Sequence, residues 1–294
     1  MTETYNELLL STQRVGVARE ALELARRLLD QVQLKYNAGE VLRNELLRAQ
    51  IEVAKAENAM LELQNQAAVG TSRLNILLGR DPQIPLSPAD QLTYQAKDFD
   101  SQRLLSQALA QRPDLKATGT ALQAQERQLQ LALRSVLEDP TLSVIGTRER
   151  GEVGTETVLG LAVRWPLPIW NRNRGAVQEA RAELAKKKAE QETLTREVSF
   201  EVANALAAAA LAQRQVHVWQ AAVEQADELM RVASLQYAER DILFITYLEH
   251  LTTVRETKLS YVQALADYRT KLALVDKVVA NTLTSPAIKK EEPR

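Results

Sequence analysis

Apolar and small residues recur along this sequence at alternating spacings of three and four, which strongly restricts the folds open to it. Such spacing lines up one stripe on a helix and is typical of a left-handed coiled coil. The first stripe comprises Leu8, Ser11, Val15, Ala18, Leu22, Ala25, Leu29, Val32 and Tyr36. A second stripe begins at Leu42, after the segment NAGE. Because Gly39 suits a left-handed turn, we predict an antiparallel helical hairpin over 1–80 with its tip near 37–41.

A second long hairpin is predicted over 171–280. The same spacing continues from Val177 to Tyr237, and the last helix ends near Val279. The segment AERD interrupts the pattern, so we place the second tip near 238–242.

The two hairpins are copies of one repeat. A shift of 201 residues places Tyr237 on Tyr36 and Arg240 on Gly39. Self-similarity of this kind indicates a duplicated supersecondary unit. We expect both tyrosines to pack the final turn of their helices.

The region between the hairpins begins with a proline-rich linker over 81–98, followed by a shorter helical segment over 99–140. Pro113 is predicted to bend or restart that helical segment, because proline lacks the N–H that a helix interior needs. At the other end of the chain, the charged tail 281–294 is predicted to be disordered.

A β-hairpin is predicted over 141–170. The segments TLSVIGTR and TVLGLAVRW alternate apolar and polar residues, and a polar turn is expected between them at 149–156. One face of the second strand carries Leu159, Leu161, Val163 and Trp165, and the opposite face carries Val158, Gly160, Ala162 and Arg164. Two prolines, Pro166 and Pro168, then form a stiff corner before the longest helix.

Residues for catalysis or metal binding are not found in the sequence. Cysteine is absent, and neither a glycine-rich phosphate loop nor a serine elbow occurs. His217 and His250 are the only histidines, and neither has ligand partners at metal-binding spacing. The net charge of −1 gives no basic face for nucleic acid. We therefore expect no enzyme, no cofactor, no metal site and no nucleic-acid partner.

The sequence alone shows no membrane-spanning helix. No apolar run approaches about 18 residues, and the N-terminus has no basic region followed by an apolar core, so no signal peptide is visible. Composition and periodicity are thus also compatible with a soluble coiled-coil scaffold.

Three segments together resemble the TolC family of outer-membrane efflux ducts, and within it the CzcC-like branch associated with heavy-metal resistance. YNAGEVLRNELLRAQ at 36–50 is similar to the family's periplasmic tip, and RPDL at 112–115 to the entry of its second half. WPLPIWNRNRG at 165–175 is similar to the corner between the last barrel strand and the longest helix. The resemblance spans about residues 5–280.

The resemblance implies a mainly α protomer, with very long antiparallel coiled-coil helices in an α-barrel and one β-hairpin contributing to a trimeric β-barrel. It implies a passive outer-membrane channel of a tripartite efflux system that exports metal cations or small toxic compounds. The partners would be two further copies of the chain, a periplasmic adaptor protein, an inner-membrane pump and outer-membrane lipid. The helices would lie in the periplasm.

The resemblance also assigns roles to residues. The adaptor would dock on the tips, at Tyr36, Gly39, Glu45, Leu46, Tyr237, Arg240 and Asp241. Four tip carboxylates would either ring a cation-selective entrance or be solvated loop charges: Glu40, Glu45, Glu239 and Asp241. The face of Leu159, Leu161, Val163 and Trp165 would meet lipid. Pro166 and Pro168 would stiffen the corner at the membrane interface.

The sequence departs from the family pattern in two ways. A signal sequence, a first helix and a first strand pair would precede Met1 in the family, so three such chains would supply six strands where the family uses twelve. At the second tip, Arg240 stands where glycine is usual and Thr246 where an acidic residue is usual. A truncated, non-inserting scaffold therefore remains the alternative to a channel.

Overall fold

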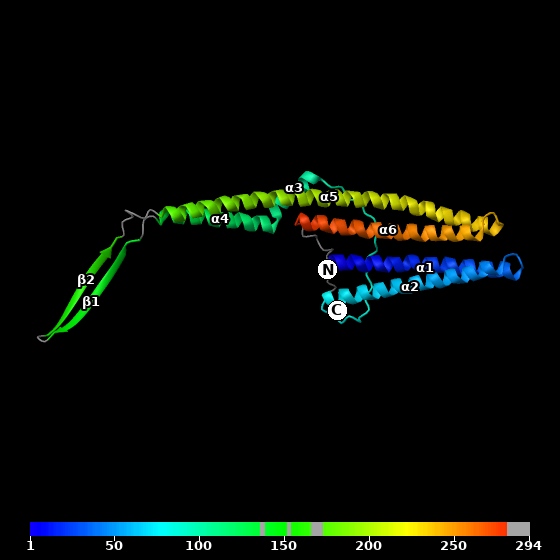
Figure 1. Ribbon diagram of the computed structural model, residues 1–294, viewed down its shortest axis with the longest axis horizontal. Coiled ribbons are helices and arrows are strands. Elements are labelled where there is room, and N and C mark those ends of the chain that lie inside the picture. The colour runs from blue at the N-terminus through cyan, green and yellow to red at the C-terminus, as the bar shows by residue number, and fades with distance from the viewer. Residues whose placement is uncertain (136–138, 152–153, 166–172, 281–294) are drawn as a thin grey trace, which may run out of the picture. The chain divides into compact units, whose positions relative to one another are not determined.

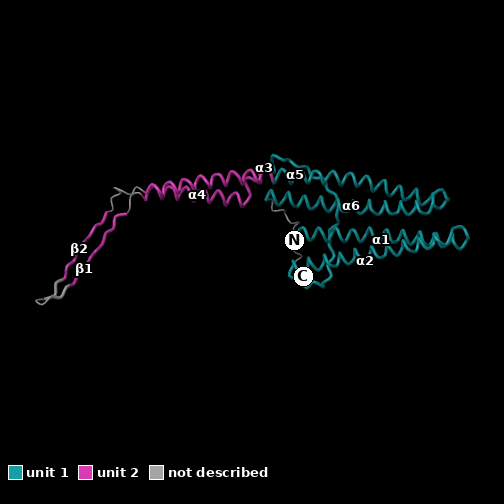
Figure 2. Tube along the Cα trace, in the orientation of Figure 1, with its two compact units in different colours: residues 1–104, 201–294 teal, residues 105–200 magenta. Residues whose placement is uncertain are grey.

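The computed structural model describes residues 1–135, 139–151, 154–165 and 173–280. Its elements, in chain order, are α1 (Thr2–Asn37), α2 (Arg43–Leu77), α3 (Ser101–Gln111), α4 (Pro113–Arg134), β1 (Thr141–Gly151), β2 (Gly154–Arg164), α5 (Arg174–Glu239) and α6 (Phe244–Val278) (Figure 1). The mainly α fold with one β-hairpin is confirmed. The described chain forms two compact units, residues 1–104 with 201–294, and residues 105–200 (Figure 2).

The first unit is built from α1, α2, α6 and the second part of α5. Helix α1 contacts both α2 and α6, so it is buried on two faces. Leu22 and Ala25 pack with Ala56 of α2. Leu28, which directly precedes the predicted stripe residue Leu29, belongs to another cluster, which α1 shares with α2, α5 and α6. The predicted stripe therefore includes only part of the buried surface of α1, because this helix has neighbours on two sides.

The repeat is visible in the turns at the two hairpin ends. Gly39 has φ 72° and Arg240 has φ 69°, so equivalent positions both adopt the left-handed conformation. In each turn the next backbone N–H bonds back to a carbonyl five residues earlier, Glu40 to Lys35 and Asp241 to Gln236. This is the hydrogen bond that closes a Schellman motif.

The repeat also extends to side-chain pairs. Arg26 of α1 lies 3.7 Å from Glu57 of α2. The equivalent residues of the second hairpin, Asp227 and Lys258, form an ion pair of opposite polarity at 3.0 Å. The same contact is thus made twice with the charges exchanged.

Equivalent tyrosines differ in burial, which corrects one prediction. Tyr237 is buried and its ring lies close to those of Phe244 and Tyr247. Tyr36 is exposed. The reason lies in the repeat, because the counterpart of Phe244 in the first hairpin is Arg43, which offers no aromatic ring to pack against.

The linker 81–98 forms a strap over the helices of the first unit (Figure 1). At its start the Asn75 amide donates to the Ile84 carbonyl at 2.8 Å. Further along, Asp90 accepts hydrogen bonds from Tyr5 of α1 and Arg269 of α6, both at 3.2 Å. The strap is therefore fastened to three of the long helices.

The end of the strap reaches α5. Leu92 is buried in a cluster with residues of α1, α5 and α6. The Tyr94 hydroxyl lies 2.8 Å from His217 Nε2, and the two rings meet edge to face. His217 thus anchors the strap, while His250 is half-buried on α6.

In the second unit, α3 ends at Gln111 and α4 begins at Pro113, so the helix restarts at the proline rather than bending. Pro113 occupies the first turn of α4, where its missing N–H costs nothing. Arg112 and Asp114 form an ion pair at 2.6 Å across the junction, and the hydrogen bond from Arg112 lowers the pKa of Asp114.

The strands are longer than predicted. β1 and β2 pair antiparallel from Thr141 opposite Arg164 to Gly151 opposite Gly154, and so include most of the expected turn at 149–156. Backbone hydrogen bonds of a ladder do not require apolar side chains, which explains why polar residues continue it. Trp165 lies just beyond β2. Pro166 and Pro168, the predicted corner, lie outside the described residues.

Candidate functional site

The two tips lie together in the first unit. Beneath them, one apolar cluster unites α1, α2, α5 and α6, and its buried members are Leu28, Val32, Leu46, Ala49, Ala226, Met230, Ala233, Tyr237, Phe244, Tyr247, Leu251 and Val254. Burial of this many side chains is the main force that joins the tips, because each contributes on the order of 1.5–3 kcal/mol when it is a Val, Leu or Phe. Leu46 and Tyr237, two predicted docking residues, are therefore core residues.

Two polar contacts cross between the tips. Arg240 forms an ion pair with Glu40 at 2.6 Å. Lys35 of α1 donates a hydrogen bond to the backbone carbonyl of Tyr237 at 2.8 Å, and its ammonium lies 4.3 Å from the centre of the Tyr237 ring. A cation at this place complements the negative end of the α5 dipole.

Lys35 was missed by the sequence prediction. Its partner lies 202 residues away, so no local pattern announces the contact. The only hint in the sequence is that Lys35 is a basic residue in the last turn of α1. Such a residue more often donates hydrogen bonds to the last carbonyls of its own helix.

The four predicted carboxylates differ in their surroundings. Glu40 is paired with Arg240, and Glu45 is half-buried close to Tyr237. Glu239 and Asp241 are exposed. Among the residues that the structure describes, no group of three His, Asp or Glu side chains is arranged to hold a metal ion.

Exposed leucines mark both tips at equivalent positions of the repeat. Leu34 corresponds to Leu235, and Leu42 corresponds to Leu243. All four are exposed, Leu42 and Leu243 by 70% and 73%. The sequence prediction missed them because their exposure depends on how the hairpins pack.

Tyr237 carries a buried hydroxyl without a hydrogen-bond partner among the described residues. Burial, with the nearby Glu45 charge and Tyr247, raises its pKa to about 12. Because burial penalises the ionised form of Tyr237 in the folded state, the free energy of unfolding does not change with this titration below the unfolded pKa of about 10, and it falls as the pH rises from about 10 towards 12.

We expect Tyr237→Phe to raise the free energy of unfolding at neutral pH by about 1 kcal/mol, because it removes an unpartnered buried hydroxyl. Stability should also fall less steeply between about pH 10 and pH 12 than in the wild type. Urea unfolding followed by circular dichroism at neutral and alkaline pH measures both effects. A clear loss of stability at neutral pH would mean that the hydroxyl is bonded.

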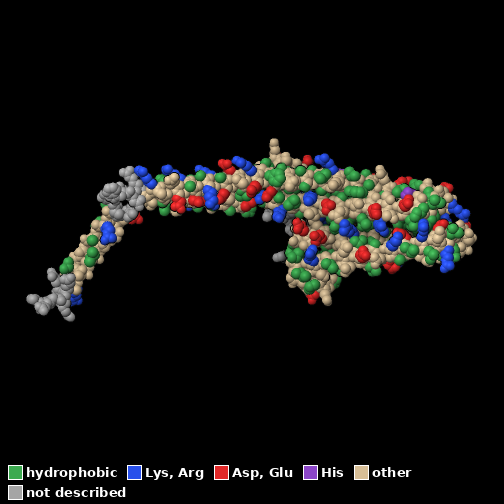
Figure 3. Space-filling view, in the orientation of Figure 1, with side chains coloured by type: hydrophobic (Ala, Val, Ile, Leu, Met, Phe, Trp, Pro, Cys, Tyr) green, Lys and Arg blue, Asp and Glu red, His purple; other side chains and the backbone are tan. Residues whose placement is uncertain are grey.

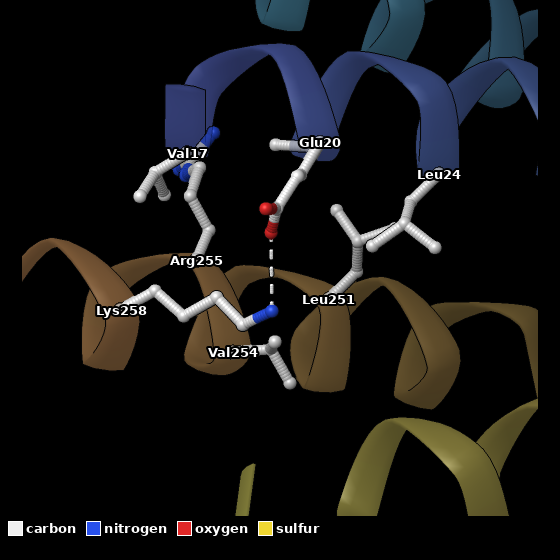
Figure 4. A pocket seen from close by; sticks show the side chains of 8 residues that line it. Val17, Glu20, Leu24, Leu251, Val254, Arg255 and Lys258 are labelled. Carbon is white, nitrogen blue, oxygen red and sulfur yellow. Dashed lines mark hydrogen bonds and ion pairs between the residues drawn. The ribbon is translucent and has the colours of Figure 1, made fainter. Parts of the chain in front are cut away.

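A small cavity lies between α1 and α6 (Figure 4). Its volume of about 20 Å³ is enough for one water molecule. At its edge, Lys258 bridges Glu20 of α1 at 3.2 Å and Asp227 of α5 at 3.0 Å. Burial opposes the charge of Lys258, but the hydrogen bonds that its ammonium donates to both carboxylates raise its pKa overall. The cavity is thus part of a contact between helices rather than a ligand site.

The β-hairpin presents an apolar face that no described residue covers. The register places Leu159, Leu161 and Val163 beside Leu142 and Val144. These five side chains are 66–79% exposed. The apolar part of this face ends at the next polar pair, Arg148 and Thr157.

The opposite face of the hairpin is smaller and more polar. It carries Ser143, Ile145 and Thr147 on β1, with Val158, Gly160, Ala162 and Arg164 on β2. The two faces differ as those of a strand pair between lipid and a water-filled lumen do. Among the described residues, no helix is both long enough and apolar enough to cross a membrane.

Comparison with known proteins identifies the class. The family model described as "Outer membrane efflux protein" matches residues 104–281, more than half of the chain. The chain therefore belongs to the outer membrane efflux protein family. Members of this family are passive channel proteins and not enzymes. No curated protein matches the sequence.

Solved structures share the fold. A membrane protein from Pseudomonas aeruginosa aligns with a TM-score of 0.72 at 19% identity, over 94% of this chain and 66% of that one. CusC aligns with a TM-score of 0.72 at 16% identity, over 94% of this chain and 66% of CusC. The CmeC outer membrane channel of Campylobacter jejuni aligns with a TM-score of 0.68 at 18% identity, over 94% of this chain and 61% of CmeC. This chain thus spans less than two thirds of each of these proteins.

Proposed function

We propose that this chain is a protomer of a trimeric outer-membrane channel, the passive duct of a tripartite efflux system. Its cargo would be metal cations or small toxic compounds, and an inner-membrane pump would supply the energy. The observation that carries this proposal is the uncovered apolar face of the β-hairpin in a chain of the outer membrane efflux protein family. Lipid, with neighbouring strands at the hairpin edges, would cover that face.

The same face argues against a soluble scaffold. A soluble protein rarely leaves such a contiguous apolar patch in water, since it would drive aggregation. On the face of the molecule seen in Figure 3, acidic and basic side chains are interspersed with apolar ones along the long helices. The helices would lie in the periplasm and the hairpin in the outer membrane.

The tips would dock a periplasmic adaptor protein. Their predicted residues at the surface are Tyr36, Gly39, Glu45, Arg240 and Asp241, of which Glu45 is half-buried, and the four exposed leucines add apolar contacts. Glu239 and Asp241, with Glu45, would contribute carboxylates to the entrance of a closed trimer, which favours cations. Glu40 would contribute less while it is paired with Arg240.

The proposal is tested by Gly39→Val in cells whose tolerance of metal salts or organic toxicants depends on this chain, its adaptor and its pump. A valine at φ 72° is strained, and nothing lies near its added Cβ, so the change acts on the tip turn alone. We expect lower tolerance with normal amounts of protein.

Gly79→Val is the matched control. Gly79 has φ 68° and equally open surroundings, but it lies at the other end of α2. We expect it to leave tolerance unchanged. Equal tolerance of both variants and wild type would contradict docking at the tips, and a chain that never supports tolerance would contradict the efflux function.

A further inference from the structure

The apolar face of the β-hairpin ends in a charged residue. Along β1, this face carries Leu142, Val144 and Gly146, and Arg148 is the next residue on it. Arg148 lies directly opposite Thr157 of β2, and both side chains are exposed. Arg148 has no ion-pair partner among the residues that the structure describes. The face therefore presents a positive charge beside a hydroxyl group, towards the end where the two strands turn.

The position of this pair along the hairpin indicates its depth in a membrane. Trp165 follows β2 at the other end, where the chain leads to α5, and the alternation of the strand places it on the same face. The stretch from Thr157 to Trp165 is nine residues long. A tilted membrane strand needs about 9–11 residues to cross the hydrocarbon. Trp165 and the pair of Arg148 and Thr157 therefore lie about one membrane crossing apart.

The behaviour of arginine on a lipid-facing strand favours the same depth. Arginine on such a face is strongly unfavourable at the midplane of the bilayer and nearly neutral at its interfaces. Its methylene groups lie along apolar surface while the guanidinium reaches towards the headgroups. Leu159, the diagonal neighbour of Arg148 across the ladder, offers such a surface. These properties put the guanidinium at the level of the lipid headgroups.

The chemistry of the pair suits a phosphate group. A guanidinium donates two parallel hydrogen bonds to two oxygens of one phosphate, which a lysine ammonium does not do. The Thr157 hydroxyl adds a third donor. Side chains directly opposite each other in an antiparallel ladder have Cβ atoms about 4.5–5.5 Å apart, so both reach the same phosphate.

We propose that Arg148 and Thr157 bind the phosphate group of a lipid headgroup at the outer surface of the membrane. The proposal rests on the proposed function, because helices in the periplasm bring the turn of the hairpin to the outer surface. Trp165 then lies at the inner interface, where tryptophan is favoured. The site thus fixes the depth of the hairpin, with a bound headgroup at one interface and an aromatic ring at the other.

Insertion of the full chain into vesicles tests the site. The wild type, Arg148→Gln and Arg148→Lys are added from detergent to phosphatidylcholine vesicles, whose choline groups neutralise the phosphates, and to vesicles that also contain phosphatidic acid. The partition ratio is measured from the chain that floats with the vesicles and resists extraction by urea. We expect the preference of the wild type for the anionic vesicles to fall about fivefold in Arg148→Gln, which is what one basic residue near an anionic surface contributes. Arg148→Lys should keep part of the preference, because it retains the charge without the paired donors.

Arg164→Gln is the matched control. Arg164 is also exposed, but it lies on the opposite face and at the other end of the hairpin. We expect it to partition like the wild type into both kinds of vesicle. The substituted positions are exposed, so helicity measured by circular dichroism should match that of the wild type. Inorganic phosphate added to the neutral vesicles should not reproduce the gain, because a free ion does not hold the hairpin at the bilayer surface.

Three results would overturn the proposal while the wild type still inserts, and these leave the proposed channel intact. Equal preferences of Arg148→Gln and Arg164→Gln would mean that no particular arginine is needed. A loss for Arg148→Gln that is as large in neutral vesicles would point to a protein partner. A gain with inorganic phosphate would indicate a site for a free anion. A wild-type chain that inserts into neither kind of vesicle would contradict the proposed channel, and the lipid site with it.

Discussion

Arginine at Leu161 should make the free energy of membrane insertion less favourable by roughly 2 to 4 kcal/mol. Arginine at Ala162 should cost much less. Leu161 pairs with Val144 in the centre of the exposed apolar face, so its replacement would place a charge in hydrocarbon. Ala162 pairs with Ser143 on the opposite face, which would line a wet lumen. The two sites are neighbours on one strand, so depth along the hairpin is nearly matched.

The measurement is recovery of each variant in outer membranes after expression behind an export signal. We expect Leu161→Arg to be depleted and Ala162→Arg to be recovered close to the wild-type level. Equal recovery of the two variants, or a wild-type chain found only in the soluble fraction, would show that the hairpin does not insert in this form.

Leu28→Ala should lower the free energy of unfolding by about 2 to 5 kcal/mol. Leu28 is 1% exposed and belongs to the cluster in which all four long helices meet below the tips. Its truncation removes apolar contacts and leaves a cavity that rigid helices cannot fill by local collapse.

Leu34→Ala is the matched control on the same helix. Leu34 is exposed, so its truncation should change stability by less than about 0.5 kcal/mol. Urea unfolding followed by helicity measures both variants. Equal and small effects would mean that the hairpins are not joined through this cluster.

The helices and turns could be predicted from the sequence because their causes are local. Stripe spacing gave the long helices, and Gly39 marked the first turn. Arg240 looked like a departure from the family pattern, yet it takes the same left-handed conformation as Gly39. Its pairing with Glu40 offsets part of the strain, although a surface ion pair is worth only about 0–1 kcal/mol.

The tip contacts could not be predicted because they join residues that are distant in the sequence. Lys35 reaches the Tyr237 carbonyl only once two hairpins lie side by side. Tyr36 and Tyr237 have the same place in the repeat, and only the identity of their neighbours decides which one is buried. Which side chains are buried on a helix with two neighbours depends on how the helices assemble. A single apolar stripe in the sequence does not determine this.

The strand pair was predicted in place but not in length. Alternation from Leu159 to Val163 identified β2, and polar residues near Glu149 indicated a turn. The ladder nevertheless continues to Gly151, because backbone pairing needs neither a core nor apolar side chains. The alternation in the sequence therefore predicts which face of the hairpin is apolar, but it does not predict where the strands end.

The mass of the purified chain in detergent tests the proposed channel most directly. Sedimentation velocity should show a complex of three chains, since the apolar face and the edges of the hairpin need neighbouring strands and lipid. A fully helical chain that stays strictly monomeric at micromolar concentration would contradict the channel.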